Sequence, residues 1–294
     1  MPRSTSRTVL TLLLTGALAL AAGACGDSDD EEDGVAGGAA ASSCEPDELE
    51  LVSEGTLTVG TDTPAFPPWF DDDDPTNGRG FESAVAYAVA EELGFAEEDV
   101  TWTTVPFNNA FAPGPKDFDF DINQVSITEE RETAVDFSDG YYEANQALVG
   151  LADSAAADAT SVEDLQDLKL GAQVGTTSLD FITDVIQPSE EPFVYNDNSA
   201  AKAALDAQQV DGIVLDLPTA LYVSAVEIEG TEVIGQFPDA EEAAGDEFGL
   251  VFEEGNALRD CADDALIALR EDGRLQEIEE EWLADVVAPE ISIG

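Results

Sequence analysis

The chain of 294 residues contains no histidine, one methionine and three cysteines. The lack of histidine excludes His-dependent nucleophilic triads and His-ligated metal sites. The cysteines, at positions 25, 44 and 261, do not form the closely spaced pairs that hold zinc. We therefore predict that the protein carries no metal and no other cofactor.

Positive charge is also scarce. Ten Lys and Arg residues stand against 65 Asp and Glu residues, which gives a formal net charge of −55 at pH 7. So few cations cannot form the basic surface that binding to nucleic acid or to an anionic membrane surface requires. Yet 44% of the residues are hydrophobic, which is enough for a folded core. The charge is typical of a solvated surface in an acidic, salt-adapted proteome.

A short hydrophobic segment lies near the start of the chain. Arg3 and Arg7 precede an apolar run at residues 9–22, which is too short to span a bilayer and is followed by small residues. This pattern predicts a secretory signal peptide at residues 1–24. We find no second hydrophobic run long enough for a membrane span. The sequence therefore predicts an exported protein.

The end of the signal peptide predicts a lipid anchor. Ala22, Gly23, Ala24 and Cys25 have the order of a lipobox, in which Cys25 is lipidated and becomes the first mature residue. The two alanines also satisfy an ordinary A-x-A cleavage site without a lipid, and this alternative stays open. Residues 25–45 are acidic and rich in Gly, Ala and Ser, which predicts a flexible tether. The predicted location is the extracellular face of the cell membrane or the periplasm.

The two remaining cysteines, Cys44 and Cys261, lie far apart in the sequence. Two thiols in an exported chain most simply form a disulfide. In the chain-entropy model, closing so long a loop contributes a few kcal/mol to stability. Two separately buried thiols are the alternative.

Short β-rich runs alternate with helical stretches along the rest of the chain. Strands are predicted at residues 57–60, 100–105, 118–124, 147–151, 170–173, 212–215 and 250–252. Helices are predicted at residues 83–93, 199–208 and 258–270, and a capping box of Ser161 and Asp164 starts another. This alternation predicts an α/β fold with mainly parallel sheets. A folded region of about 250 residues is large for one core, so we expect two lobes.

The predicted strand at residues 118–124 begins with an alternating pattern. Phe118, Asp119, Phe120 and Asp121 would place two rings on one face and two carboxylates on the other. The pattern therefore predicts a half-exposed strand.

The most informative motif surrounds Arg131. Residues 126–131 read Ser-Ile-Thr-Glu-Glu-Arg, and residues 135–142 read Val-Asp-Phe-Ser-Asp-Gly-Tyr-Tyr. This pattern resembles the ligand-binding signature of the polar amino acid family of extracellular solute-binding proteins, family 3, which deliver ligands to ABC importers. Without that resemblance, Arg131 is equally well a surface side chain paired with Glu130 or Asp136.

Other stretches resemble motifs of the same family and follow in the same order. They lie at residues 55–68, 80–82, 162–165, 170–178, 210–216 and 272–282. The resemblance implies a two-lobed, periplasmic-binding-protein-like fold of type II, a Venus flytrap with two hinge crossovers. It implies a first lobe at residues 46–143 plus 246–288 and a second at residues 146–240. The hinges would lie near residues 142–146 and 240–248.

The resemblance also implies roles for individual residues. Arg131 would bind the α-carboxylate of a polar L-amino acid, because a planar guanidinium can hold a carboxylate with two hydrogen bonds. Asp216, from the other lobe, would bind the α-ammonium group, so that only the closed form satisfies both charges. Ser126 would donate its hydroxyl, and main-chain groups of Gln124 and Thr176 would complete the polar shell.

Five further residues match the ligand-binding positions of the family. Phe66 and Phe107 match two rings that enclose the ligand side chain. Thr177 opens a helix whose N-terminal amides favour an anion. Asp62 would lie at the mouth of the pocket, and Gln173 occupies a position with polar contacts in some relatives. From the residues alone, the two phenylalanines are core residues and the strand-end aspartates are turn or cap residues.

The function that the resemblance implies is that of a binding protein and not of an enzyme. It would be a monomer that hands its ligand to an ABC permease with its ATPase. One alternative is a cyclohexadienyl dehydratase-like enzyme acting on prephenate or arogenate, with Glu82 or Asp62 as a buried acid. A second alternative is a ligand-sensing surface receptor.

Overall fold

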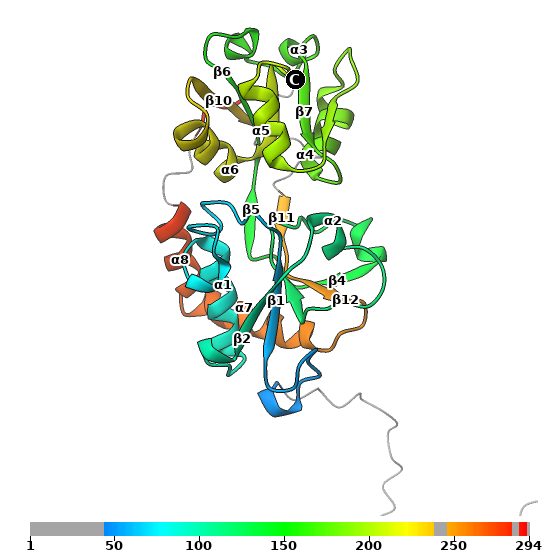
Figure 1. The fold of residues 1–294 in the computed structure, drawn as a ribbon, viewed down its shortest axis with the longest axis vertical. Coiled ribbons are helices and arrows are strands. Elements are labelled where there is room, and N and C mark those ends of the chain that lie inside the picture. The colour runs from blue at the N-terminus through cyan, green and yellow to red at the C-terminus, as the bar shows by residue number, and fades with distance from the viewer. Residues whose placement is uncertain (1–43, 238–245, 284–287, 293–294) are drawn as a thin grey trace, which may run out of the picture. The chain divides into compact units, whose positions relative to one another are not determined.

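The computed structural model describes residues 44–237, 246–283 and 288–292 (Figure 1). The predicted signal peptide, Cys25 and nearly all of the predicted tether lie outside these residues, as does most of the second predicted hinge. Within the described residues, no helix is both long enough and apolar enough to cross a membrane. The described residues contain two five-stranded sheets and one two-stranded sheet.

The first sheet combines early and late segments of the chain, which are blue to green and orange in Figure 1. Its strands are β1 (Leu57–Thr61), β2 (Val100–Thr104), β3 (Phe120–Asp121), β4 (Val135–Phe137) and β12 (Val251–Glu253). Their order is β2-β1-β3-β12-β4. β1 is parallel to β2 and β3, whereas β12 is antiparallel to β3 and β4.

Three helices pack against one another beside the first sheet, namely α1 (Phe81–Glu92), α7 (Leu258–Glu271) and α8 (Arg274–Leu283). A shorter helix, α2 (Phe107–Ala110), follows β2. Gly80, with φ of 96°, precedes α1, and a Cβ there would lie 2.4 Å from the main-chain oxygen of Trp69. Only glycine fits this left-handed position and close approach. The core formed by the helices and the sheet includes Trp69, Phe81 and Phe252.

The second sheet uses the middle of the chain, green to yellow in Figure 1. Its strands are β6 (Gln146–Leu151), β7 (Leu170–Gln173), β8 (Phe193–Tyr195), β9 (Gly212–Asp216) and β10 (Thr231–Phe237). Their order is β10-β6-β9-β7-β8, with β7 parallel to β8 and β9, and β6 antiparallel to β9 and β10. Successive residues of β6, Leu148 and Val149, enter two different cores, so the sheet is covered on both faces.

Four helices accompany the second sheet. They are α3 (Val162–Leu165), α4 (Thr177–Asp180), α5 (Asn198–Asp206) and α6 (Leu217–Tyr222). The predicted capping box at the start of α3 is confirmed, and Asp164 accepts a hydrogen bond from the Ser161 N–H at 3.0 Å. A 3-10 turn, Arg131–Thr133, precedes β4 on the first-sheet side.

A two-stranded ribbon lies at the passage between the sheets. β5 (Tyr142–Ala144) leads from the first sheet into β6, and β11 (Asp246–Phe248) leads into β12. The two strands pair antiparallel, with Tyr142 opposite Phe248. Both rings pack edge-on against Trp69, with centroid separations of 5.6 and 5.7 Å.

The C-terminal residues 288–292 return to the second sheet. Gln236 on β10 donates its N–H to the Pro289 carbonyl at 2.7 Å and accepts the Ile291 N–H at 2.8 Å. Ile291 is buried in one of the two second-sheet cores. The sequence analysis assigned no structure to residues 289–292.

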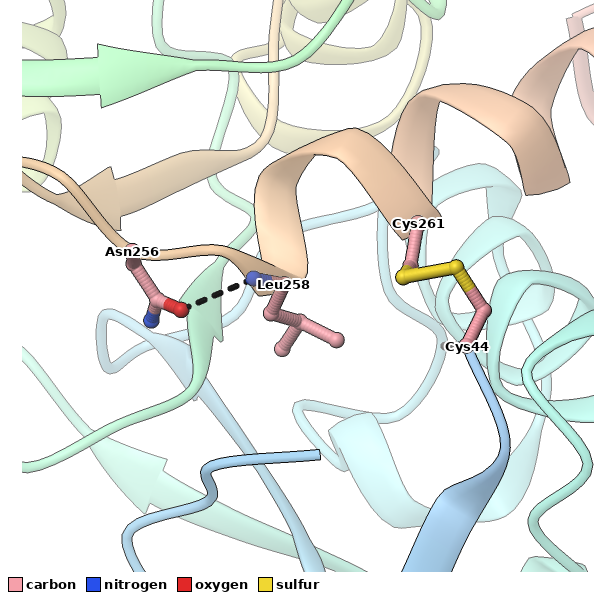
Figure 2. The surroundings of a disulfide bond; sticks show 4 residues. All are labelled: Cys44, Asn256, Leu258 and Cys261. Atoms are coloured by element: carbon pink, nitrogen blue, oxygen red, sulfur yellow. Dashed lines mark hydrogen bonds between the residues drawn. A yellow bond between two sulfur atoms is a disulfide. The ribbon is translucent and has the colours of Figure 1, made fainter. Parts of the chain in front are cut away.

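A disulfide joins Cys44 to Cys261, as was predicted for two thiols in a chain expected to be exported (Figure 2). Cys261 lies one turn inside α7, whose first N–H group, from Leu258, is accepted by the side chain of Asn256 at 2.9 Å. The bond therefore fixes the first described residue to a helix of the first-sheet core.

Each five-stranded sheet is mixed. Four of its strands run in one direction, in keeping with the expectation of mainly parallel sheets, and one strand runs against them, β12 in the first sheet and β6 in the second. One expectation about the first sheet is wrong. The strand predicted at residues 118–124 spans only Phe120–Asp121, and Phe118, Asp119, Phe120 and Asp121 are all buried. β3 lies in the middle of its sheet, and Asp119 accepts the N–H groups of Val52 and Thr58 at 2.7 and 2.6 Å, so its carboxylate is satisfied inside.

Candidate functional site

One cavity is lined by all ten residues that the sequence predicted for ligand binding. These are Asp62, Phe66, Phe107, Gln124, Ser126, Arg131, Gln173, Thr176, Thr177 and Asp216. Nine further residues complete the lining: Thr63, Pro64, Asn123, Gln146, Ser178, Asp197, Asn198, Leu215 and Phe248. The cavity therefore combines loops at the ends of β1, β3, β7 and β9 with Gln146 at the start of β6 and Phe248 at the end of β11.

Arg131 is buried, with 8% of its surface exposed, and its guanidinium is held by main-chain carbonyls. Nη1 donates to the Ser126 carbonyl at 2.6 Å, and Nη2 donates to the Gly175 carbonyl at 2.9 Å. A guanidinium has five N–H donors, so three remain beyond these two bonds. The Phe111 ring lies under the group, with its centroid 4.4 Å from Cζ.

The Gly175 carbonyl reaches Arg131 because of the local backbone. Gly175 has φ of 77°, and a Cβ there would lie 2.3 Å from Oδ1 of Asn108. This left-handed position and close approach require glycine. The bond from Arg131 to Gly175 therefore connects the first-sheet side of the cavity to the loop after β7.

The alternative reading of Arg131 as a paired surface residue is wrong. Among the described residues, no carboxylate forms an ion pair with it. Asp136 instead accepts the Gly255 N–H at 2.7 Å. Burial lowers the pKa of Arg131, and the nearby charges of Asp246, Asp180 and Glu130 oppose that shift. The guanidinium is therefore a buried cation, and the nearby carboxylates that favour its charge form no ion pair with it.

Asp216 ends β9 and lines the cavity while it caps the next helix. Its Oδ1 accepts the Thr219 N–H at 2.9 Å at the start of α6. The expectation of a cap residue is therefore confirmed, and it is compatible with a place in the cavity wall. Burial raises the pKa of Asp216 to about 6, against the lowering effect of the Thr219 hydrogen bonds.

Ser126 and Thr177 meet across the cavity, with their hydroxyl oxygens 3.2 Å apart. Thr177 also donates to Asp246 Oδ2 at 2.7 Å, and Gln146 donates to the same oxygen. An ionised carboxylate only accepts, so the Thr177 proton points to Asp246 and Ser126 donates to Thr177. In this arrangement the proton of Ser126 is directed to Thr177.

Thr176 caps α4 at the end of the loop after β7. Its hydroxyl accepts the Leu179 N–H at 3.2 Å and donates to the Gln173 carbonyl at 2.8 Å. Gln173 is 7% exposed and ends β7. The sequence assigned both residues to a ligand loop, and the cap explains why a hydroxyl stands at this position.

The two predicted rings lie at different parts of the cavity wall. Phe107 packs edge-on against Phe111 with centroids 5.3 Å apart, and the Phe107 N–H is accepted by Asp62 Oδ2 at 3.1 Å. Phe66 lies on the loop after β1, and the ammonium of Lys202 on α5 is 3.7 Å from its ring centroid. Neither ring is fully buried. Phe107 packs against the small core cluster of Val125, Val135, Phe137 and Val251, so the expectation of a core residue holds in part for Phe107.

Glu82 is buried behind the cavity wall and is not among the lining residues. Its Oε1 accepts the Gln124 N–H at 2.7 Å, and its carboxylate also accepts the Gln124 side-chain amide and the Tyr141 hydroxyl. Burial raises the pKa of Glu82 to about 7, although these hydrogen bonds lower it. A carboxylate that accepts three donors and does not reach the cavity is not placed to protonate a substrate.

Three charged residues at the site were not predicted from the sequence: Asp197, which lines the cavity, and Lys202 and Asp246, which contact the lining residues Phe66 and Thr177. Asp197 caps α5 by accepting the Ala200 N–H at 2.7 Å, and an aspartate before an Ala-rich helix is a signal that could have located it. Lys202 pairs with Glu227 at 2.8 Å and Asp246 bonds to Thr177, and both contacts join residues far apart in sequence. No local pattern predicts such contacts.

Comparison with known proteins identifies the family. The model of the bacterial extracellular solute-binding proteins, family 3, matches residues 57–285. The chain belongs to this family. The family 3 chain is thus a solute-binding protein, and its two five-stranded sheets with a connecting ribbon are consistent with the two-lobed fold of the periplasmic amino-acid-binding proteins that it resembles.

Curated relatives of this family 3 protein are named as amino-acid-binding proteins. The chain is 29% identical over 243 residues to the L-cystine-binding protein TcyJ of Escherichia coli (strain K12), covering 81% of this chain and 87% of the relative. It is 28% identical over 228 residues to the arginine-binding periplasmic protein of Mannheimia haemolytica, covering 75% and 88%. Among solved structures, an ancestral arginine-binding protein bound to arginine superimposes with a TM-score of 0.65 and 31% identity, covering 78% of this chain and 98% of that one.

Proposed function

We propose that this chain is the extracellular substrate-binding component of an ABC importer, which captures a polar L-amino acid between two closing lobes. The lobes are residues 46–143 plus 246–288 and residues 146–240, with the ribbon of β5 and β11 as the hinge. The observation that carries the proposal is Arg131, a buried guanidinium with three N–H donors to spare and no ion pair among the described residues. A ligand carboxylate would accept hydrogen bonds from these N–H groups and supply the negative charge that the guanidinium lacks.

The other end of the ligand requires a counter-charge on the opposite wall. Asp216 lines the same cavity from the second-sheet side and is the assigned partner of the α-ammonium group. A ligand that bonds to both residues stabilises the closed form, because separated lobes leave one of the two charges without its partner. Ser126 adds a hydroxyl donor after its proton rotates from Thr177 to the carboxylate.

The rest of the proposed site surrounds the ligand side chain. Phe66 and Phe107 supply apolar walls, and Asp62 lies beside Phe107. Gln124, Gln173, Thr176 and Thr177 provide the remaining polar groups of the shell.

The charges of the lining favour one class of side chain. An amino acid's own two charges neutralise Arg131 and Asp216, which leaves Asp62 and Asp197 on the wall. We therefore expect neutral polar and cationic side chains to bind more tightly than acidic ones.

Isothermal titration of the mature domain, freed of copurified ligand and kept in high salt, against the twenty L-amino acids tests the proposal. Saturable one-to-one binding that is lost in Arg131→Ala supports it. Silence across the panel contradicts it and directs the work to turnover of prephenate and arogenate. Gene neighbours that encode a permease and an ATPase would separate import from sensing.

We also propose export and anchoring by lipid at Cys25. The support is the sequence pattern of residues 1–25, together with a family defined as extracellular. Mass spectrometry of the mature N-terminus should find a lipidated Cys25. A free N-terminus at Cys25 without lipid contradicts the anchor but not the export.

A further inference from the structure

Gln124 occupies an unusual backbone position in the cavity wall. Its φ of 49° is left-handed, which is uncommon for a residue with a side chain. Its main-chain N–H and its side-chain amide nitrogen each donate one hydrogen bond to the buried carboxylate of Glu82, which is not among the lining residues. The carboxylate therefore holds the backbone and the side chain of Gln124 together.

The hydrogen bonds of Gln124 determine which of its polar groups are left for a ligand. Glu82 accepts the main-chain N–H and one of the two amide N–H groups, so the polar groups left over are the main-chain carbonyl and side-chain Oε1, which only accept, and the second amide N–H. No described residue donates a hydrogen bond to either acceptor. Gln124 therefore keeps two acceptors and one amide N–H for other partners, with its amide nitrogen held on the side of Glu82.

We propose that Glu82 is a positioning residue that sets the polarity of the ammonium-binding part of the site through Gln124. This inference rests on the proposed function. Three donors converge on the Glu82 carboxylate, two from Gln124 and one from Tyr141, and an ionised carboxylate is the side chain that accepts them all. With the amide nitrogen held by Glu82, Oε1 is the end of the amide of this lining residue that is left to accept from a ligand ammonium group.

Protonation of Glu82 reverses this arrangement. A carboxylic acid donates from one oxygen. The Tyr141 hydroxyl can accept that proton as it stands, and Gln124 Oε1 can accept it after the amide has rotated by a half turn, which is the outcome that the proposal requires. The amide NH₂ group then faces the cavity, where it meets the ligand ammonium donor to donor. The proton comes from solvent and no covalent bond changes.

The groups around Glu82 place this exchange near neutral pH. Burial raises the pKa of Glu82 to about 7, and the like charge of Asp216 on β9 raises it further. The charge of Glu82 in turn raises the pKa of Asp121 on β3. Tyr141, which donates to Glu82, has its own pKa raised well above the usual value by burial and remains protonated. A ligand cation bound nearby favours ionised Glu82, so ligand binding and proton release are linked.

The first test compares the pH dependence of binding in three proteins. Wild type should bind its amino acid at least tenfold more weakly at pH 5.5 than at pH 8.5. Glu82→Gln keeps the shape and mimics the protonated acid, so it should bind weakly at pH 8.5 and lose most of the pH dependence, leaving the part that belongs to Asp216. Asp119→Asn removes another buried first-sheet carboxylate, which accepts Val52 and Thr58 N–H groups away from the cavity, and should follow wild type.

The second test asks whether Glu82 acts through Gln124. Gln124→Met removes the amide and keeps the length of the side chain. In that background, Glu82→Gln should cost little further affinity, because the group that it orients is gone. An equal loss of affinity from Glu82→Gln in both backgrounds contradicts the proposal and indicates a general effect on the fold.

The third test needs neither ligand nor variant. In the ligand-free protein, the side-chain amide resonances of Gln124 should shift between pH 5.5 and 8.5 with the same midpoint as the Glu82 carboxyl carbon. An amide that stays fixed while Glu82 titrates overturns the proposal, whatever the protein binds. If the amide shifts but no amino acid binds, the coupling of Glu82 to Gln124 stands and the proposed function fails.

Discussion

The guanidinium of Arg131 donates to the main-chain carbonyl of Gly175 at 2.9 Å, across the cavity between the first-sheet and second-sheet sides. The same group bonds to the Ser126 carbonyl on its own side. Arg131 thus belongs to the contact between the two sides as well as to the cavity wall. Its fork of donors is what allows both roles, since each nitrogen points in a fixed direction.

Arg131→Lys should therefore abolish measurable amino-acid binding. A single ammonium cannot hold two carbonyls and a bidentate carboxylate together, and we expect a loss of at least 100-fold, or about 3 kcal/mol. Titration calorimetry measures the loss. Arg274→Lys is the matched control, because Arg274 pairs on the surface with Glu91 and Glu92 and should leave affinity unchanged. Normal binding by the Arg131 variant contradicts the assigned carboxylate site.

Asp216→Asn separates the charge of this residue from its role as a helix cap. Asparagine also caps helices well, so α6 and the melting temperature should be little affected. Loss of the ammonium partner should weaken binding on the order of 100-fold. Asp197→Asn, at the cap of α5 in the same cavity, should cost far less for a ligand with a neutral side chain. Equal losses in the two variants would show that Asp216 has no special place in the site.

Stability should fall as the pH rises from about 4.5 to about 7. Burial raises the pKa of Glu82 from 4.5 to about 7, so the folded state holds this proton more firmly than the unfolded state does. The favourable contribution is present below the unfolded value and is lost on ionisation, on the order of 3 kcal/mol for Glu82. Urea unfolding at pH 5 and pH 8 measures the difference, which should shrink in Glu82→Gln. A higher stability at pH 8 than at pH 5 contradicts this expectation.

Added salt should raise the melting temperature steeply. A formal charge of −55 produces strong self-repulsion in the folded state, and salt screens it. Calorimetric scans from dilute buffer to molar sodium chloride would reveal the trend. A melting temperature that does not change with salt would mean that the surface charges are spaced widely enough not to destabilise the folded state.

Loss of the disulfide should destabilise the first-sheet core. The bond joins residues 217 positions apart, and the chain-entropy model gives a contribution of up to about 5 kcal/mol for such a loop. The free energy of unfolding of a Cys44→Ser, Cys261→Ser variant, compared with wild type, measures it. Reductant should lower the stability of wild type and leave the variant unchanged.

Much of the fold could be predicted because buried strands and capped helices have local signals. The strand at residues 170–173 has the predicted bounds, and α7 begins at the predicted Leu258. β8 was missed because it is a three-residue edge strand with exposed Phe193 and Val194, so its pattern is weak. The sense of β12 could not be predicted, since it depends on which way the chain returns to the first sheet.

The site was predictable to the extent that its residues lie in family motifs. All ten predicted residues line one cavity because the motifs fall at strand ends that the fold brings together. The roles of these residues in binding remain predictions. Glu82 was predicted as part of the motif at residues 80–82 and as a possible buried acid of the enzyme alternative. Its contact with Gln124 was not predicted, because it joins residues 42 positions apart and leaves no trace in either local sequence.

On the proposed lipid anchoring, the disulfide determines which part of the molecule is held at the membrane. Cys44 is bonded to Cys261 on α7, and α7 packs against α1. The N-terminal segment is therefore linked covalently to the first-sheet core, and this link does not pass through β5 or β11. With the anchor at Cys25, the part built on the first sheet is the part that stays fixed. If the proposed function also holds, the part built on the second sheet, with α5 and Asp216, is the part that moves, and closure would bring Asp216 toward a ligand bound at Arg131.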